Sequence, residues 1–223
     1  DCLLSRGLGD VYKRQIFLRT LCLVAVTLFF TSAGASQGEI ILAVNTLLMQ
    51  LFTLFSYVMD GFAYAGEALS GRYIGARNRE AFTDTVRHLF GWGAVIAVLF
   101  TLVYALGGNA FLGLLTDDKE VIAVADTYFY WALAVPAVGI AAFIWDGIFI
   151  GATATRGMLL SMAAAAVSFF ILYYGLHPVL ANHALWLAFL TYLLMRGVVQ
   201  TGLSREVIRR AFPSKKEPAW REG

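Results

Sequence analysis

The stretch YVMDGFAYAGEALSGRYIGARNRE, residues 57 to 80, closes an apolar run that begins at Ile40 and leads into a segment rich in arginine. Such a run can cross a bilayer, because roughly 20 helical residues span a hydrocarbon core of about 30 Å. It nevertheless carries two carboxylates, Asp60 and Glu67. The stretch therefore predicts a membrane-spanning helix with acidic groups toward one end, and the remaining sequence repeats this alternation of apolar runs and polar turns.

The composition agrees with a membrane protein. Of the 223 residues, 59% are hydrophobic and 14% are charged, whereas soluble domains carry about 25% charged residues. The apolar runs predict an all-α integral membrane protein, a bundle of six transmembrane helices. We expect these helices to cover residues 16–36, 40–70, 88–107, 125–150, 158–178 and 183–204.

The chain divides into three segments. Its first fifteen residues, DCLLSRGLGDVYKRQ, have neither an initiator Met nor the apolar core of a signal peptide. We expect residues 1–15 to be a non-native leader and the native protein to continue upstream. Residues 16–210 are the predicted six-helix transmembrane lobe, and residues 211–223 are a predicted cytoplasmic basic tail.

The distribution of Lys and Arg predicts the topology. If the first helix starts inside, the inner segments hold eleven Lys and Arg residues and the outer segments hold only Lys119. Because cytoplasmic loops retain Lys and Arg, we expect a multi-pass protein of the inner (plasma) membrane with both termini in the cytoplasm. Nucleic-acid binding by the tail is the weaker interpretation, since basic residues are expected beside the membrane on this side.

The side chains that commonly bind metals are scattered. The two cysteines, Cys2 and Cys22, and the three histidines, His88, His177 and His183, show no spacing typical of a disulfide framework or a zinc site. We therefore predict no metal site and no cofactor.

The second predicted helix has one polar face and one apolar face. At 100° per residue, its polar side chains lie within about 60° of the direction of Asp60. We expect one face to meet lipid and the other to meet protein or water. The polar face comprises Asn45, Thr46, Thr53, Ser56, Tyr57, Asp60, Tyr64 and Glu67, and the apolar face comprises Leu51, Leu54, Phe55, Val58, Phe62 and Leu69.

Four charged residues fall at a similar depth in the inner half of the bundle: Asp60, Asp146, Arg19 and Arg196. An isolated charge inside a span costs on the order of 3 kcal/mol or more, so these groups should pair or face water. They could form an ion-pair network that fixes the bundle, or a protonatable or cation-binding site whose partners exchange during a conformational cycle. The sequence leaves both readings open. Glu67 lies roughly 10 Å further along its helix, and we expect it to be interfacial.

Five stretches together resemble a known family. The chain resembles the C-terminal half of the multidrug and toxic compound extrusion (MATE) family, in particular its DNA-damage-inducible-F-like branch, over about residues 16–205. The stretches are IFLRT (16 to 20), LAVNTLLMQ (42 to 50), DGFAYAGEALSGRYIGARN (60 to 78), WDGIFIGAT (145 to 153) and LWLAFLTYLLMRG (185 to 197).

The resemblance implies a secondary active transporter, a twelve-helix antiporter built from two six-helix lobes, of which this chain matches one. Such a protein exports organic cations or other toxic amphiphiles in exchange for H⁺ or Na⁺. Its expected partners are the lipid bilayer, a small amphiphilic substrate and the N-terminal lobe of the same protein. Some members of other branches place a glutamate in the helix that corresponds to residues 16–36, which hold no acidic residue here. That departure puts a sodium site of that type in doubt.

Carried onto this sequence, the resemblance makes Asp60 and Asp146 the candidates for a carboxylate that faces the lobe's cavity. Four polar and aromatic residues are candidates to line that cavity, since aromatic faces attract organic cations. They are Asn45, Gln50, Tyr57 and Tyr64.

Two alternatives remain at this point. A lipid-linked oligosaccharide flippase of the same superfamily should have a more cationic cavity, whereas the candidate interior charges here balance, two against two. An intramembrane enzyme would need Asp60 and Asp146 as a catalytic dyad, but no protease motif accompanies them and each has a possible Arg partner. We therefore expect a transporter and not an enzyme.

Overall fold

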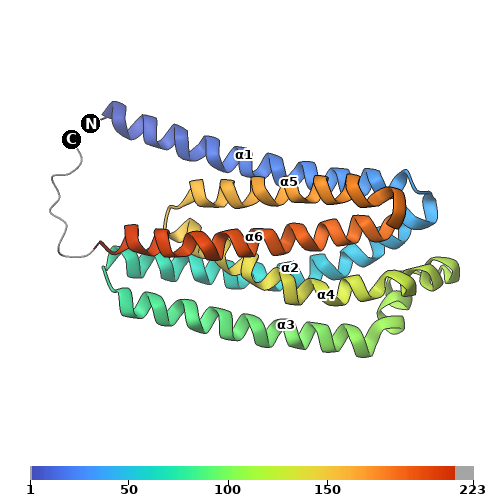
Figure 1. The fold of residues 1–223 in the computed structure, drawn as a ribbon. Coiled ribbons are helices and arrows are strands. Elements are labelled where there is room, and N and C mark those ends of the chain that lie inside the picture. Colours follow the sequence, from blue (N-terminus) through green and yellow to red (C-terminus); the bar gives the residue numbers. More distant parts are fainter. Residues whose placement is uncertain (1, 214–223) are drawn as a thin grey trace.

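The computed structural model describes residues 2–213. This part of the chain forms six α-helices joined by short turns (Figure 1). They are α1 (Cys2–Ala35), α2 (Glu39–Gly75), α3 (Arg79–Leu115), α4 (Lys119–Gly151), α5 (Thr155–Leu180) and α6 (Asn182–Ala211). Residues 214–223 of the predicted basic tail lie outside the described residues.

All six helices are long and apolar enough to cross a membrane, which confirms the prediction of a six-helix all-α bundle. Their ends differ from the prediction. The third helix covers Arg79–Leu115 and not 88–107, because its 37 residues measure about 55 Å and the apolar pattern marks only the roughly 30 Å inside lipid. The first helix begins at Cys2 and continues without a break past residue 15. The end of the leader at residue 15 is therefore a prediction from the sequence, and no change of secondary structure marks it.

The two ends of the bundle carry opposite charge. The start of α1, the end of α6 and the α2–α3 and α4–α5 turns lie at one end, which we call the basic end (Figure 1). The turns there contribute Arg77, Arg79 and Arg156. The three other turns form the acidic end, with Glu39 and Asp118 beside them.

Local chemistry fixes where the helices begin and end. Helices α2 and α4 close with the same pattern, in which a residue in the left-handed region follows the helix: Arg77 with φ 52° and Thr153 with φ 55°. The next amide reaches back to the last turn, from Asn78 to the Tyr73 carbonyl at 2.9 Å and from Ala154 to the Phe149 carbonyl at 2.8 Å. Two such closures satisfy carbonyls that would otherwise be unpaired at the membrane surface.

Side-chain caps start two of the helices. The Asn78 side chain accepts a hydrogen bond from the Ala81 amide at the start of α3. The Asp118 carboxylate accepts bonds from the amides of Glu120 and Val121 at the start of α4. Each cap satisfies amides that have no partner within the helix.

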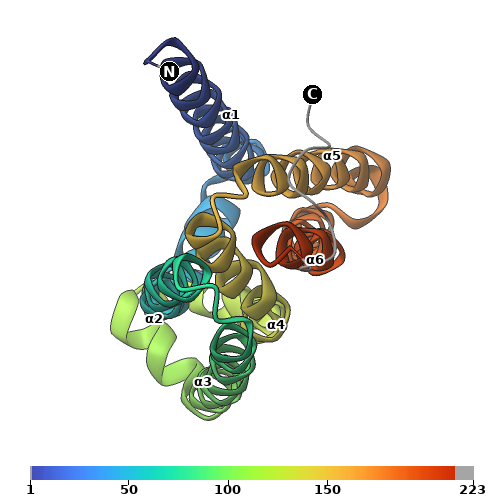
Figure 2. The same ribbon diagram turned by 90° about the vertical axis from the view of Figure 1, so that its left-hand side faces the viewer.

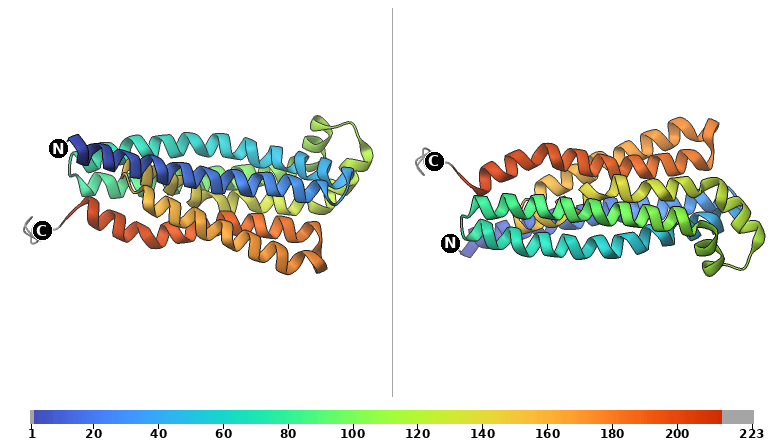
Figure 3. Two further views of the ribbon diagram at one scale, coloured as in Figure 1. Left: turned by 90° about the horizontal axis from the view of Figure 1, so that it is seen from above. Right: turned by 90° about the horizontal axis from the view of Figure 1, so that it is seen from below.

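Helix α4 is the centre of the bundle. Seen from the basic end, it lies between α2 and α3 on one side and the α5–α6 hairpin on the other, while α1 stands at the periphery (Figure 2). It packs most extensively against α2, then α6 and α3, whereas α1 packs mainly against α5. All six run along one long axis (Figure 3). Every residue of 142–149 in α4 is buried, so a charge in that segment needs partners inside the protein.

The apolar face of α2 corrects one expectation. Leu51 and Phe55 do not meet lipid, because they are 2% and 0% exposed inside the bundle. The Tyr104 hydroxyl donates to the Leu51 carbonyl at 2.7 Å, and the Phe55 ring meets two other rings edge to face. On the other side, Tyr57 and Tyr64 are 72% and 71% exposed. Helical periodicity separates the two faces, but it does not say which one the neighbouring helices cover.

Candidate functional site

The candidate site is a buried carboxylate in the middle of the bundle. Asp146 lies in the fully buried segment of α4 and is 8% exposed. Removing an ionised carboxylate from water costs several kcal/mol unless partners replace the lost hydration. The surroundings of Asp146 therefore decide what it can do.

Three donors from two other helices surround this carboxylate. Its Oδ2 atom accepts from the guanidinium of Arg19 on α1 and from that of Arg196 on α6, each at 2.5 Å. Its Oδ1 atom accepts from the Gln200 amide at 2.6 Å. The carboxylate thus ties α1, α4 and α6 together, and two cations stabilise its ionised form.

Two of the three donors to Asp146 lie on α6, one helical turn apart. Tyr192, Arg196 and Gln200 follow at four-residue intervals, so they share one face of the helix. The Arg196 guanidinium lies 5.6 Å from the centre of the Tyr192 ring, a cation–π contact. Sequence reasoning missed Gln200, although its position one turn after Arg196 was a usable signal.

The two arginines differ in how firmly they are held. The side chain of Arg196 is 7% exposed, whereas that of Arg19 is 21% exposed. Arg19 also comes from α1, which makes few contacts with α2, α4 or α6. The contact from Arg19 to Asp146 is therefore the one that a movement of α1 can break.

Glycines beside the charged residues let the helices approach closely. A Cβ on Gly147 would lie 2.0 Å from the Ala63 carbonyl oxygen of α2, and one on Gly151 would lie 2.4 Å from the Glu67 carbonyl oxygen. On α6, a Cβ on Gly197 would lie 2.8 Å from the Cβ of Ala141. Only glycine fits at such distances, so the backbone of α4 fixes Asp146 relative to both neighbouring helices.

Asp60 is placed near the cluster but is not part of its hydrogen bonds. It is half-buried on α2 and close enough to interact electrostatically with Asp146 and Arg196. Among residues 11–213, no hydrogen bond or salt bridge reaches its carboxylate. The sequence analysis expected the four charged groups to pair or to face water, and in the structure both guanidinium groups converge on Asp146. The negative charge of Asp60 nevertheless offsets the positive charge of the second arginine, so the formal charges of Asp60, Asp146, Arg19 and Arg196 sum to zero.

The predicted cavity-lining residues fall into two groups. Asn45 exchanges two hydrogen bonds with the Asn182 side chain, at 2.8 and 2.9 Å, and accepts a third from Trp186 Nε1 at 2.9 Å. It therefore joins α2 to α6 and does not line a cavity. Tyr57 and Tyr64 are exposed on the polar face of α2, and Gln50 is exposed beside that face.

The surroundings of Glu67 match an interfacial position only in part. Its side chain is half-buried, and among residues 11–213 it makes no salt bridge. The guanidinium of Arg72, five residues further along α2, lies 5.9 Å from the centre of the Tyr73 ring. Glu67 thus stays outside the Asp146 cluster.

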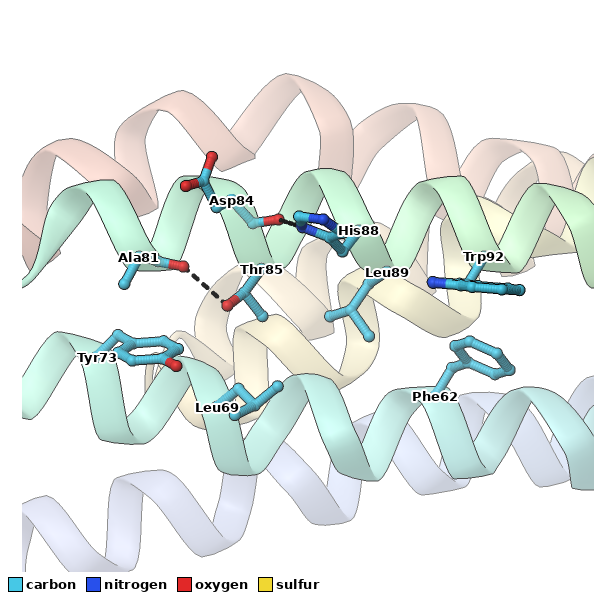
Figure 4. A pocket seen from close by; sticks show the side chains of 9 residues that line it. All are labelled: Phe62, Leu69, Tyr73, Ala81, Asp84, Thr85, His88, Leu89 and Trp92. Carbon is cyan, nitrogen blue, oxygen red and sulfur yellow. Dashed lines mark hydrogen bonds between the residues drawn. The ribbon is translucent and has the colours of Figure 1, made fainter.

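A separate hollow between α2 and α3 lacks the features of a charged site. It measures about 360 Å³ and is walled by Phe62, Leu69, Leu89 and Trp92 (Figure 4). The Asp84 carboxylate points away from α2 in this view and faces Arg87 at 3.6 Å. Within the described residues, no group of three or more His, Cys, Asp or Glu side chains is arranged to hold a metal.

Comparisons with known proteins identify the family. The family model described as MatE matches residues 16–179. DNA damage-inducible protein F of Escherichia coli K12 is 42% identical over 186 residues, which cover 83% of this chain and 40% of that protein. Protein DETOXIFICATION 45, chloroplastic, of Arabidopsis thaliana is 26% identical over 149 residues, covering 66% of this chain and 27% of its own.

A solved structure shows the same fold. It is described as a crystal structure of MATE in the bent conformation, and it matches 92% of this chain and 44% of its own with a TM-score of 0.71 and 18% identity. The chain thus spans less than half the length of the relatives it matches. The match of the family model over most of the chain, together with the bacterial relative, shows that this chain belongs to the MATE family of transporters.

Proposed function

We propose that the chain forms the C-terminal lobe of a cation-coupled antiporter that exports amphiphilic organic cations or other toxic compounds in exchange for H⁺ or Na⁺. The observation that carries the proposal is the Asp146 carboxylate, which two guanidinium groups from separate helices bind in the middle of the membrane-spanning bundle. Ionisable groups inside a span are expensive, and in transporters they mark ion pathways.

The mechanism follows from the unequal environments of the two aspartates. Asp146 is saturated by donors, whereas the half-buried Asp60 has none within the described part of the chain. A coupling ion or proton would therefore bind at Asp60. When Asp60 is ionised and empty, it would compete with Asp146 for a guanidinium group, and Arg19 is the more exposed of the two arginines. Exchange of Arg19 between the two carboxylates would couple ion binding to a movement of α1.

The electrical driving force is adequate for such a cycle. One elementary charge that moves through 100 mV is worth about 2.3 kcal/mol. Because about 1.4 kcal/mol corresponds to a tenfold concentration ratio, one coupling ion can support a substrate gradient of more than tenfold.

The substrate and the other lobe meet the exposed face of α2. Tyr57 and Tyr64 present uncovered rings along this face, and aromatic faces bind organic cations by about 0.5 to 2 kcal/mol each. A second lobe from the N-terminal part of the protein would close a cavity over these rings. The balanced charge of Asp60, Asp146 and the two arginines does not favour a flippase for pyrophosphate-linked sugars, and the comparisons give no support to an intramembrane enzyme.

The orientation is part of the same proposal. Lys and Arg residues cluster at the basic end of the bundle, so this end, with both termini, would face the cytoplasm of a cell whose inner membrane holds the protein.

Resistance assays with the full reading frame test the proposal. In a host without its own efflux pumps, Asp60→Asn and Asp146→Asn should each lower resistance to ethidium more than Glu67→Gln does, at equal protein levels. Equal and mild losses at all three positions would leave the charges only a structural role. Ethidium efflux from vesicles that contain the same protein, with an imposed pH or sodium gradient, identifies the coupling ion.

A further inference from the structure

A second hollow, at the basic end of the bundle, differs from the hollow between α2 and α3 because arginine side chains line it. It measures about 720 Å³ and lies between the end of α2, the α4–α5 turn and α6, and α1 contributes only Gln15, the last residue of the predicted leader. Its volume falls in the range of roughly 300 to 1,000 Å³ that is usual for small-molecule sites. Its lining includes the apolar side chains Ile74, Leu160, Leu203 and Val207 and the cations Arg156 and Arg210.

The charge of this hollow is positive. Arg156 is exposed at its rim, and among residues 11–213 no carboxylate lies within salt-bridge distance of it. The lining carboxylate of Glu206 is shared by two cations, Arg209 at 2.5 Å and Arg210 at 2.8 Å. Two guanidinium groups, those of Arg156 and Arg210, therefore line the hollow together with one carboxylate, which leaves an excess of one positive charge for an anion.

The lining also changes character along the bundle axis. Leu160 lies five residues into α5 from Thr155, and Leu203 lies seven residues before Arg210 on α6. The leucines therefore mark the side of the hollow that faces the membrane, and the arginines mark its aqueous rim. An occupant that fits both parts has an anionic head and an apolar tail.

We propose that this hollow binds the phosphate of an anionic phospholipid, with the guanidinium groups of Arg156 and Arg210 on the phosphate and the acyl chains along Leu160 and Leu203. Arginine forks suit phosphate oxygens, and basic pockets between membrane helices on this side are suited to lipid headgroups. The lipid joins the α4–α5 turn to α6, the helix that also carries Arg196 and Gln200. The site is independent of the transport mechanism proposed above.

The test measures protection against heat. The purified chain in a neutral detergent is titrated with dioleoyl phosphatidylglycerol and, separately, with dioleoyl phosphatidylcholine, and the unfolding temperature is followed by circular dichroism. Phosphatidylglycerol should raise the unfolding temperature more. Arg156→Gln should weaken its apparent affinity about fivefold, the loss expected for one cation near an anionic lipid.

Arg87→Gln is the matched control, because it removes one exposed cation of the same end from α3, outside the hollow. It should leave the affinity unchanged, and Arg156→Glu should abolish the preference for phosphatidylglycerol. Equal losses in R156Q and R87Q would mean that lipid binds the basic end without a defined site and would overturn the proposal. Equal protection by free glycerol phosphate would likewise overturn it, since the site would then bind soluble phosphate.

Discussion

Asp146 and Asp60 have the same side chain, but their surroundings give them opposite sensitivities to mutation. Asp146→Asn would leave the buried Arg196 without its counter-ion, because the other carboxylate nearby makes no salt bridge within residues 11–213. Removing one partner of a buried pair typically costs about 3 to 5 kcal/mol. We expect a loss of that size in the free energy of unfolding, measured by denaturant titration of the purified chain in detergent.

Asp60→Asn is the comparison at the same scale. No hydrogen bond or salt bridge to Asp60 is lost within the described residues, so its free energy of unfolding should change by less than about 1 kcal/mol. If transport by the intact protein nevertheless falls strongly, the role of Asp60 is functional. A destabilisation equal to that of D146N would contradict the separate roles assigned to the two carboxylates.

Residues from distant parts of the chain also meet at the acidic end, where Asn45 accepts or donates three hydrogen bonds. Asn45→Leu would leave the buried Asn182 side chain and the Trp186 Nε1–H without partners. An unsatisfied buried polar group costs about 1 to 3 kcal/mol. We expect a loss in that range in the free energy of unfolding, whereas Thr46→Ala, which removes only an exposed bond to its own helix, should change it by less than about 0.5 kcal/mol.

At the scale of helices, the close crossing of α2 and α4 depends on glycine. Gly147→Ala would place a Cβ 2.0 Å from the Ala63 carbonyl oxygen, so the helices must separate and the contacts around Asp146 must loosen. Overpacking of this kind typically costs about 1 to 3 kcal/mol or more. Gly61→Ala is the control, because no heavy atom lies within 4 Å of its Cβ. The stability of that variant should be unchanged or increase by up to about 1 kcal/mol, because alanine has a higher helix propensity than glycine. Thermal unfolding of both variants in detergent measures the difference.

The helices also show what the sequence could and could not predict. The apolar runs identify each membrane-spanning helix, but they do not predict where the helices end. At Arg79–Arg87, for example, α3 includes a charged segment outside the apolar run. Depth along the helices placed Arg19, Asp146 and Arg196 at one level, and the structure brings them together. Which of two aspartates receives the arginines depends on helix rotation and packing, which no single helix encodes, and the uncharged Gln200 gave no signal of burial cost.

At the scale of the whole molecule, the chain spans 40% of the bacterial relative that it matches, and the polar face of α2 is exposed at Tyr57 and Tyr64. Tyr57 and Tyr64 would meet lipid if the lobe stood alone in a bilayer, and a cavity that alternates between two sides of a membrane needs a second rigid half to move against. A movement of α1 that exchanges Arg19 between carboxylates would then have no partner lobe to displace.

We therefore expect the 223-residue chain, reconstituted alone into proteoliposomes, to give no ethidium efflux when a pH or sodium gradient is imposed. The full reading frame in the same vesicles should give efflux that collapses when the gradient is removed. Circular dichroism must show that the lone chain is helical, so that inactivity is not caused by unfolding. Co-reconstitution with the missing lobe as a separate polypeptide should restore at least part of the efflux, because the lobes contribute complementary faces. Robust gradient-driven efflux by the lone chain would contradict the assignment of this bundle as half of a transporter.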